Sequence, residues 1–244
     1  MQDSNLELKR LAAALPDIPR WVETRSLLLK GECELFGLDE ENGLAFVINS
    51  AECELVSVVG HPAFKAIEDA VSGIHNQSLV LATPNNNTHV SQALPGWKSA
   101  PARIHLLSDS SRLPATTETI VRLLAPTELA SGSRLPTDLK EELTDASRYS
   151  PIAATVVDGL PVSFCYAAAE TEGLWDISID TLAPYRNRGY AGLCVSYMVK
   201  VMSMRGKRPV WGAEESNIAS ISLARKLGFE PVDHLMVFRS TDRG

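Results

Sequence analysis

Cysteine is scarce in this chain of 244 residues, and its four cysteines are widely separated. Cys33, Cys53, Cys165 and Cys194 form no CxxC pair and have no histidine spaced as a companion ligand. We therefore expect neither a metal site nor a disulfide framework. Reduced thiols of this kind are typical of a cytoplasmic protein.

Long apolar runs are also missing. No segment approaches the roughly 18 consecutive apolar residues that a membrane span requires. The first ten residues, MQDSNLELKR, are charged where a secretory signal peptide would have an apolar core. The sequence therefore predicts no membrane association and a cytoplasmic location.

A concentrated basic region is the third absence. The chain has 30 acidic and 23 basic residues, a net charge of -7, and the acidic residues are spread along it. Because binding to a phosphate backbone needs a basic face, this balance excludes a nucleic-acid partner. With 45% hydrophobic and 22% charged residues, the composition is that of a soluble globular protein.

Apolar periodicity predicts alternating strands and helices in both halves of the chain. In the first half we expect helices over 5–14, 62–74 and 88–94, and strands over 44–48, 55–59, 78–82 and 102–107. In the second half we expect strands over 119–124, 174–181, 209–213 and 235–239, helices over 137–148, 190–205 and 217–227, and a hairpin over 152–167. The hairpin follows from Asp158-Gly159, a favoured two-residue turn between β-rich segments.

A short polar segment, 110–118, separates the two halves. We place the boundary there, which gives domains 1–115 and 116–244. Sliding the chain against itself by about 132 residues pairs LVLATPNN of the first half with VWGAEESN of the second. A duplication would produce this match, and so would two unrelated α/β units with the same alternation of strands and helices.

The most informative segment, 186–192, lies between an expected strand and an expected helix. It reads Arg186-Asn187-Arg188-Gly189-Tyr190-Ala191-Gly192. The start of a helix offers unpaired N–H groups and the positive end of the macrodipole, which stabilise a phosphate. Glycine and alanine let the backbone approach such a ligand closely, and the arginines add charge. A plain helix start with two solvated arginines is the alternative reading.

This loop resembles the Arg/Gln-x-x-Gly-x-Gly/Ala signature of the GNAT superfamily of acetyl-CoA-dependent N-acetyltransferases. A downstream segment, Asn217 to Phe229, resembles that family's second motif, in which Asn opens a helix that ends in Leu-Gly-Phe. The resemblance covers about residues 116–240. It implies an α/β fold, with a mixed, mostly antiparallel, twisted sheet flanked by helices. It also implies a catalytic domain over 116–244 and a degenerate GNAT-like domain over 1–115.

The resemblance further implies where acetyl-CoA binds. The strand 174–181 would separate from the strand 209–213, so that the pantetheine arm binds main-chain groups near Ile179 and Thr181. The loop 186–192 would hold the pyrophosphate. The second motif would contribute Asn217 and Ser220, although Asn217 also suits a helix N-cap.

Direct transfer to an amine needs a neutral amine, so a base is expected. We nominate Glu214 first and Asp176 second, each against the alternative of a solvated or ion-paired carboxylate. The family often has a Tyr, acting as acid, at the position that is Ala224 here. Tyr185 or Tyr190 could replace it only if a hydroxyl reached the sulfur. Cys194 lies in an apolar stretch, which favours a buried thiol over an acyl-cysteine intermediate.

The first half has Val59-Gly60-His61-Pro62 where the second half has the glycine loop, so we expect one cofactor site per chain. The leading interpretation is an N-acetyltransferase that acts on a small amine, and the acidic residues near the gap favour a cationic acceptor. A non-catalytic acyl-CoA-binding sensor and a peptide N-terminal acetyltransferase are the alternatives. We expect a monomer or a homodimer.

Overall fold

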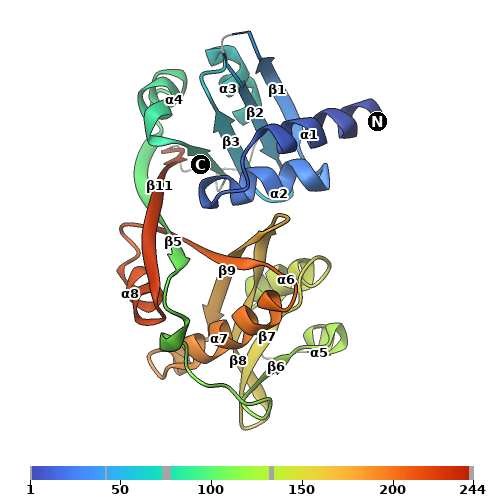
Figure 1. The fold of residues 1–244 in the computed structure, drawn as a ribbon, viewed down its shortest axis with the longest axis vertical. Coiled ribbons are helices and arrows are strands. Elements are labelled where there is room, and N and C mark those ends of the chain that lie inside the picture. Colours follow the sequence, from blue (N-terminus) through green and yellow to red (C-terminus); the bar gives the residue numbers. More distant parts are fainter. Residues whose placement is uncertain (1, 42, 73–77, 132–134, 242–244) are drawn as a thin grey trace. The chain divides into compact units, whose positions relative to one another are not determined.

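Strands and helices alternate along most of the chain (Figure 1). The computed structural model describes residues 2–41, 43–72, 78–131 and 135–241. The helices are α1 (Gln2–Ala14), α2 (Val22–Lys30), α3 (Phe64–Val71), α4 (Asn87–Ala93), α5 (Pro126–Ser131), α6 (Thr137–Ala146), α7 (Tyr190–Ser203) and α8 (Ile218–Lys226). The strands are β1 (Glu34–Asp39), β2 (Ala45–Ser50), β3 (Leu55–Val59), β4 (Leu79–Ala82), β5 (Lys98–Leu107), β6 (Val121–Leu123), β7 (Ala153–Val157), β8 (Leu160–Glu170), β9 (Leu174–Thr181), β10 (Arg208–Glu214) and β11 (Phe229–Arg239).

Residue contacts divide the chain into two compact units. Unit 1 comprises Met1–Ile104, Gly212–Ile218 and Pro231–Gly244, and unit 2 comprises His105–Trp211 and Ala219–Glu230. Each unit therefore contains sequence from both halves of the chain, because β5, β10 and β11 each have residues in both units. The division into a degenerate domain and a catalytic domain between residues 115 and 116 stays a prediction.

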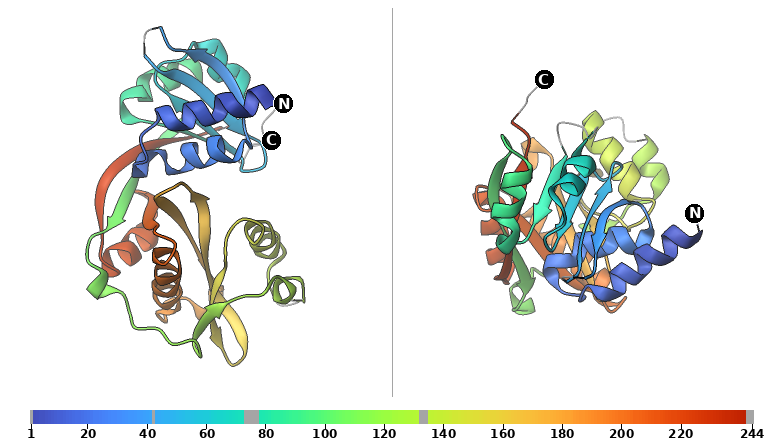
Figure 2. Two further views of the ribbon diagram at one scale, coloured as in Figure 1. Left: turned by 45° about the vertical axis from the view of Figure 1, so that its right-hand side comes forward. Right: turned by 90° about the horizontal axis from the view of Figure 1, so that it is seen from above.

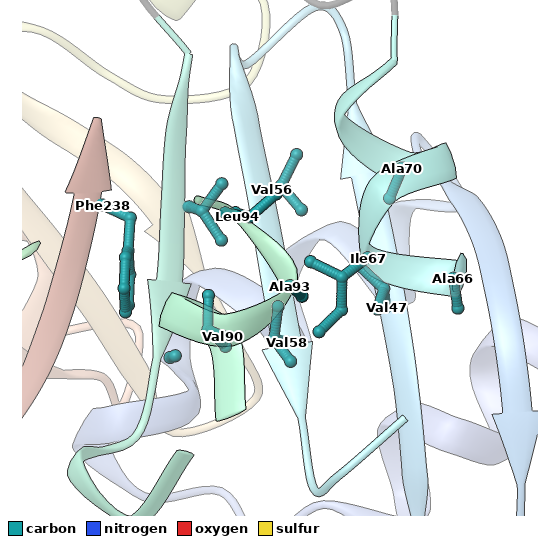
Figure 3. Close-up of a cluster of buried hydrophobic side chains, with 12 residues drawn as sticks. Val47, Val56, Val58, Ala66, Ile67, Ala70, Val90, Ala93, Leu94 and Phe238 are labelled. Carbon is teal, nitrogen blue, oxygen red and sulfur yellow. The ribbon is translucent and has the colours of Figure 1, made fainter. Parts of the chain in front are cut away.

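The strands of unit 1 follow the order β1-β2-β3-β4-β11. β3 and β4 are parallel, whereas the other neighbours are antiparallel. The last strand of the chain completes the core of this unit, since Phe238 of β11 is fully buried among residues of β2, β3, α3 and α4 (Figure 3). The same cluster extends across β4 and β3 to Val47 of β2 and Ile67 of α3.

The strands of unit 2 follow the order β10-β9-β8-β7-β6. β9 and β10 are parallel and the remaining pairs are antiparallel. Helices α6 and α7 cover opposite faces of these strands (Figure 2). On the α6 face Leu143 packs with Phe164 and Tyr166, and on the α7 face Cys194 contacts the carbonyl oxygen of Ala153. The expected mixed, mostly antiparallel sheet flanked by helices is confirmed.

The local sequence was sufficient to predict the position of several elements. β3 and β9 have the predicted bounds, and the turn Asp158-Gly159 has positive φ angles of 50° and 76°, as a two-residue hairpin turn requires. In each unit a strand, a helix, a parallel strand and a second helix follow one another: β3-α3-β4-α4 and β9-α7-β10-α8. The described helices include none that is both long and apolar enough to cross a membrane.

Three elements were not expected from the sequence: α2, β1 and α5. Polar residues of α2 are buried, which hides the apolar periodicity of a surface helix. Arg25 is 8% exposed and donates to the carbonyl oxygens of Ala12 and Leu15, where α1 ends. The buried arginine thus binds carbonyl oxygens that lack intrahelical partners at the end of α1. No local sequence pattern predicts this use of an arginine.

Candidate functional site

The loop before α7 has the conformation that the sequence suggested. A short 3-10 turn, Ala183–Tyr185, leads from β9 into Arg186, Asn187 and Arg188. Gly189 then caps α7 with a φ of 83°, a left-handed conformation that glycine adopts readily, and no side chain caps the helix start. The first N–H groups of α7 have no intrahelical acceptors, so an anion can bind them.

The space around the loop glycines differs. A Cβ atom built on Gly189 meets no atom within 4 Å, so this side of the loop is open. At Gly192 a Cβ would lie 3.3 Å from the side chain of Leu227. Gly189 therefore suits a close ligand approach, whereas the structure gives Gly192 a role in packing α7 against the chain that follows α8.

The arginine and tyrosine side chains of the loop support its shape. The Arg186 Nε donates to the Thr181 carbonyl oxygen at 2.9 Å, and the Arg188 guanidinium lies 5.8 Å from the centre of the Tyr185 ring. The rings of Tyr185 and Tyr190 are 6.4 Å apart. Both arginines are exposed, so their charge is available to a ligand at the start of α7.

The edge of β9 that faces away from β8 is only partly paired. The ladder with β10 runs from Leu174 opposite Arg208 to Asp176 opposite Val210 and stops there within unit 2, whereas β9 continues to Thr181. On its other edge, β9 pairs with β8 up to Thr181. Main-chain groups alternate between the two edges of a strand. Since the N–H of Leu182 and the carbonyl of Asp180 face β8, those of Ile177, Ile179 and Thr181 face the open edge.

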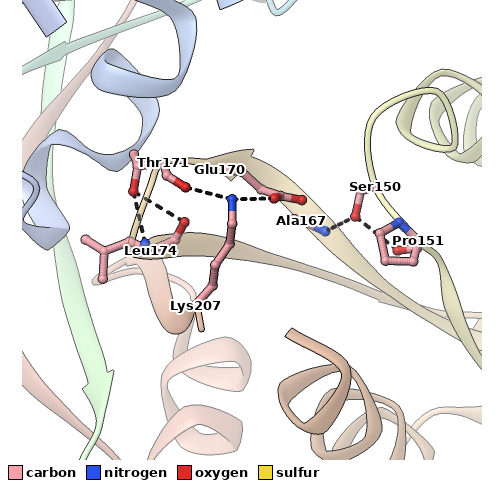
Figure 4. A network of polar contacts seen from close by, with 7 residues as sticks. All are labelled: Ser150, Pro151, Ala167, Glu170, Thr171, Leu174 and Lys207. Atoms are coloured by element: carbon pink, nitrogen blue, oxygen red, sulfur yellow. Dashed lines mark hydrogen bonds and ion pairs between the residues drawn. The ribbon is translucent and has the colours of Figure 1, made fainter. Parts of the chain in front are cut away.

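A polar network fixes the paired end of β9 (Figure 4). Lys207 Nζ donates to the Glu170 carboxylate and to the Thr171 carbonyl oxygen, each at 2.7 Å. The N–H of Leu174 donates to the hydroxyl of Thr171 at 3.0 Å. These bonds connect the turn before β9 to Lys207, the residue before β10. They therefore hold β9 and β10 side by side at the end where their ladder starts.

The corresponding pair in unit 1 has no such open edge. β3 and β4 stay paired from Leu55 opposite Leu79 to Val58 opposite Ala82. The following loop is filled by its own chain, because a Cβ on Gly60 would lie 2.3 Å from the Leu44 carbonyl oxygen. Pro62 also lacks an N–H group.

The other predicted site residues fall into both units. Asp176 is 9% exposed on β9, and Ser220 accepts a hydrogen bond from the Trp211 indole at 2.9 Å, both in unit 2. Glu214 and Asn217 belong to unit 1. There Glu214 forms an ion pair with Arg239 and its carbonyl oxygen accepts the N–H of Asn217 at 2.9 Å.

A cluster that the sequence did not indicate lies on the α6 face of unit 2. The Tyr166 hydroxyl donates to the Glu142 carboxylate, and the register sets Tyr166 opposite Ser178. Burial, the bond to Glu142 and the charges of Glu142 and Asp180 raise the pKa of Tyr166, so its phenol stays protonated. These residues come from α6, β8 and β9, and the strand register and the packing of α6 on this face bring them together.

Cys194 is buried, and its thiol contacts the carbonyl oxygens of Ala153 at 3.1 Å and Ser163 at 3.5 Å. Burial raises the pKa of Cys194 to about 12, so the nucleophilic thiolate is not formed near neutral pH. This environment gives no support to an acyl-cysteine intermediate.

Thiol reactivity provides a direct check. Cys53 is exposed, whereas burial and the charges of Cys53 and Glu32 raise the pKa of Cys33 to about 12. Cys165 and Cys194 are buried. We expect Ellman's reagent to label one thiol per native chain within minutes at pH 8. The Cys53→Ser variant should lack this rapid labelling. Rapid labelling of Cys194, located by peptide mass spectrometry, would contradict the structure.

Comparisons with known proteins agree with this geometry. Residues 128–238 match the GNAT acetyltransferase family model. A GCN5-related N-acetyltransferase-like protein from Streptococcus suis is 18% identical, with 98% of this chain and 99% of that chain covered and a TM-score of 0.65. An acetyltransferase of the GNAT family from Colwellia psychrerythraea is 12% identical, with coverages of 99% and 97% and a TM-score of 0.62. At these identities the similarity shows the fold. The sequence matches no curated protein.

Proposed function

We propose that the chain transfers an acetyl group from acetyl-CoA to the primary amine of a small molecule, because residues 128–238 match the GNAT acetyltransferase family model. The observation that carries the proposal is the open edge of β9 beside the uncapped start of α7. The first offers main-chain partners for the amides of a pantetheine arm, and the second offers N–H groups for a pyrophosphate.

The residues present fit such a cosubstrate. Ile179 and Thr181 would bind the pantetheine amides through main-chain groups, with the Thr181 carbonyl already engaged by Arg186. The N–H groups of Gly189, Tyr190, Ala191 and Gly192 would hold the pyrophosphate, with charge from Arg186 and Arg188. Asn187, whose φ is 60°, would help to set the loop conformation. Asn217 and Ser220 remain proposed contributors from the second motif.

Transfer would proceed by direct attack. The amine nitrogen attacks the thioester carbonyl carbon, a tetrahedral intermediate forms, and the thiolate leaves as the amine loses its proton to a base. A main-chain N–H on the open edge of β9 would stabilise the oxyanion. Asp176 is the better base candidate, because it is 9% exposed at the last paired position of β9, where the open edge begins, whereas the Glu214 side chain is 25% exposed.

Two isosteric variants distinguish these carboxylates. We expect Asp176→Asn to lower kcat by about 100-fold or more while acetyl-CoA affinity changes little, since general base catalysis contributes that much. Glu214→Gln should lower kcat less than about threefold. Glu215→Gln, whose carboxylate pairs with Arg103 at 2.8 Å, is the control for a change in surface charge. The reverse order of effects would make Glu214 the base.

The test of the function is calorimetric titration with acetyl-CoA, followed by amine-dependent thiol release. One site per chain is expected, because β3 and β4 stay paired and Gly60 is packed against Leu44. Two sites would contradict this assignment. Binding without thiol release for any amine would favour an acyl-CoA sensor, an alternative supported by the buried Ala224 at the usual tyrosine position.

A further inference from the structure

A large apolar cavity of about 750 Å³ lies within unit 2, on the α6 face of β8. Pockets of this size accommodate small organic ligands. Most of its lining is aliphatic or aromatic and includes Leu129, Leu135, Val162, Phe164, Leu182 and Tyr185. The cavity would therefore bind an apolar group rather than a sugar or a linear polyamine.

One carboxylate also lines this cavity, but its charge is balanced within the protein. The Arg122 guanidinium binds both oxygens of Glu128, at 2.8 Å and 2.6 Å, and the N–H of Ala125 donates to the same group at 2.9 Å. Glu128 therefore has little attraction left for a ligand cation.

Two further carboxylates, those of Asp180 and Glu142, lie on the same face of unit 2 as the cavity. Asp180 is opposite Phe164 in the register, and Leu182, which follows β9 directly and donates its N–H to the Val162 carbonyl oxygen, is two residues further on, so two cavity-lining residues are next to Asp180. The Glu142 carboxylate accepts the Tyr166 hydroxyl, and the charge of Asp180 also acts on that hydroxyl. In the described part of the chain, neither Glu142 nor Asp180 pairs with an Arg or Lys.

We infer that the cavity and the Glu142–Asp180 pair form the acceptor site, and that the acceptor is an amphiphilic primary amine with an aromatic or branched aliphatic body. The apolar body occupies the cavity, and the ammonium group binds the two carboxylates beside Tyr166. This inference rests on the proposed acetyl transfer and names its substrate class. Ser178 lies opposite Tyr166, and the next residue on the same face of β9 is Asp176, about 7 Å further on.

The apolar body and the ammonium group of the ligand contribute separately to its binding affinity. A carboxylic acid would be repelled by Glu142 and Asp180, and a neutral alcohol would bring no positive charge to either of them. A short hydrophilic amine would satisfy the charges but leave the cavity unfilled. Only a ligand with both features uses both parts of the site.

The first experiment measures binding to the full chain without acetyl-CoA, using three matched probes. 2-Phenylethylamine has both features, ethylamine lacks the apolar body, and 2-phenylethanol lacks the charge. Calorimetry should give 2-phenylethylamine at least about 10-fold higher affinity than either of the others. Equal affinity for all three probes would overturn the proposal.

Variants locate the binding. Glu142→Gln and Asp180→Asn should each weaken 2-phenylethylamine at least about fivefold and leave 2-phenylethanol unchanged. Ala183→Trp places a ring at an exposed cavity-lining position and should weaken both aromatic probes without affecting ethylamine. Glu141→Gln, an exposed neighbour on the same helix, is the control and should change none of these affinities. Unchanged binding in all three site variants would place the amine elsewhere.

Acetyl-CoA titration and acetylation assays of the unaltered chain separate this inference from the proposed function. If the chain binds acetyl-CoA and acetylates ethylamine and 2-phenylethylamine with equal kcat/KM, the acetyl transfer stands and the acceptor class is wrong. If 2-phenylethylamine binds as described but acetyl-CoA does not, the amine site stands and the transferase function fails.

Discussion

Replacing Gly189 with glutamate is expected to abolish acetyl-CoA binding while the chain remains folded. A Cβ at this position has open space, so the substitution creates no internal clash, although the φ of 83° costs about 1–2 kcal/mol for a residue with a side chain. The carboxylate would stand at the N–H groups of α7 where the pyrophosphate is proposed to bind. We expect Kd to rise by at least about 100-fold, or about 2.7 kcal/mol, in calorimetric titration.

The matched control for this variant is Gly206→Glu. Gly206 follows the other end of α7, has a φ of 75° and also has no atom within 4 Å of a built Cβ. Both variants should therefore lose similar stability by thermal unfolding, and only the change at Gly189 should affect acetyl-CoA. Normal binding by Gly189→Glu would remove the phosphate-loop assignment.

Gly228→Ala is expected to produce the largest loss of stability. Gly228, the central residue of Leu227-Gly228-Phe229, has a φ of 90°, and a Cβ there would lie 2.1 Å from the Asp109 carbonyl oxygen. Its own carbonyl accepts the N–H groups of Ser108 and Asp109 at 3.0 Å and 3.2 Å. The left-handed conformation costs about 1–2 kcal/mol and each displaced hydrogen bond about 1 kcal/mol, so we expect a loss of about 3–4 kcal/mol in urea unfolding.

Gly159→Ala separates these contributions. Gly159 has a φ of 76° in the β7–β8 turn, but no atom lies within 4 Å of a built Cβ. Alanine at this position should lower the free energy of unfolding only by the cost of the left-handed backbone conformation, about 1–2 kcal/mol. Equal losses for the two variants would mean that the approach of the Asp109 carbonyl to Gly228 does not limit stability.

Several elements depend on short-range signals, so they could be predicted from the sequence. Asp158-Gly159 sets a hairpin because both residues tolerate positive φ. The loop before α7 could be recognised because glycine and small residues at a strand-to-helix junction favour anion binding. The location of this loop, and hence the family resemblance, needed only local spacing.

The acceptor-side cluster could not be found in this way. Glu142, Tyr166 and Asp180 are separated along the chain, and they meet only because β8 pairs with β9 in one register and α6 covers that face. A shift of one residue would turn each strand side chain to the opposite face. The sequence nominated Glu214 and Asp176 as bases, and the structure added the partner of Glu214, which is Arg239.

The sequence by itself determined the α/β class, the strand and loop that lead into α7, and the glycine on which a phosphate contact would depend, because each is encoded within a few neighbouring residues. Only the tertiary structure decided that the β10-side edge of β9 is unpaired beyond Asp176 within unit 2, whereas β3 stays paired with β4, and that Phe238 of β11 completes the core of unit 1. These features depend on strand register and on contacts between distant residues, which are fixed by packing of the whole chain rather than by local propensity.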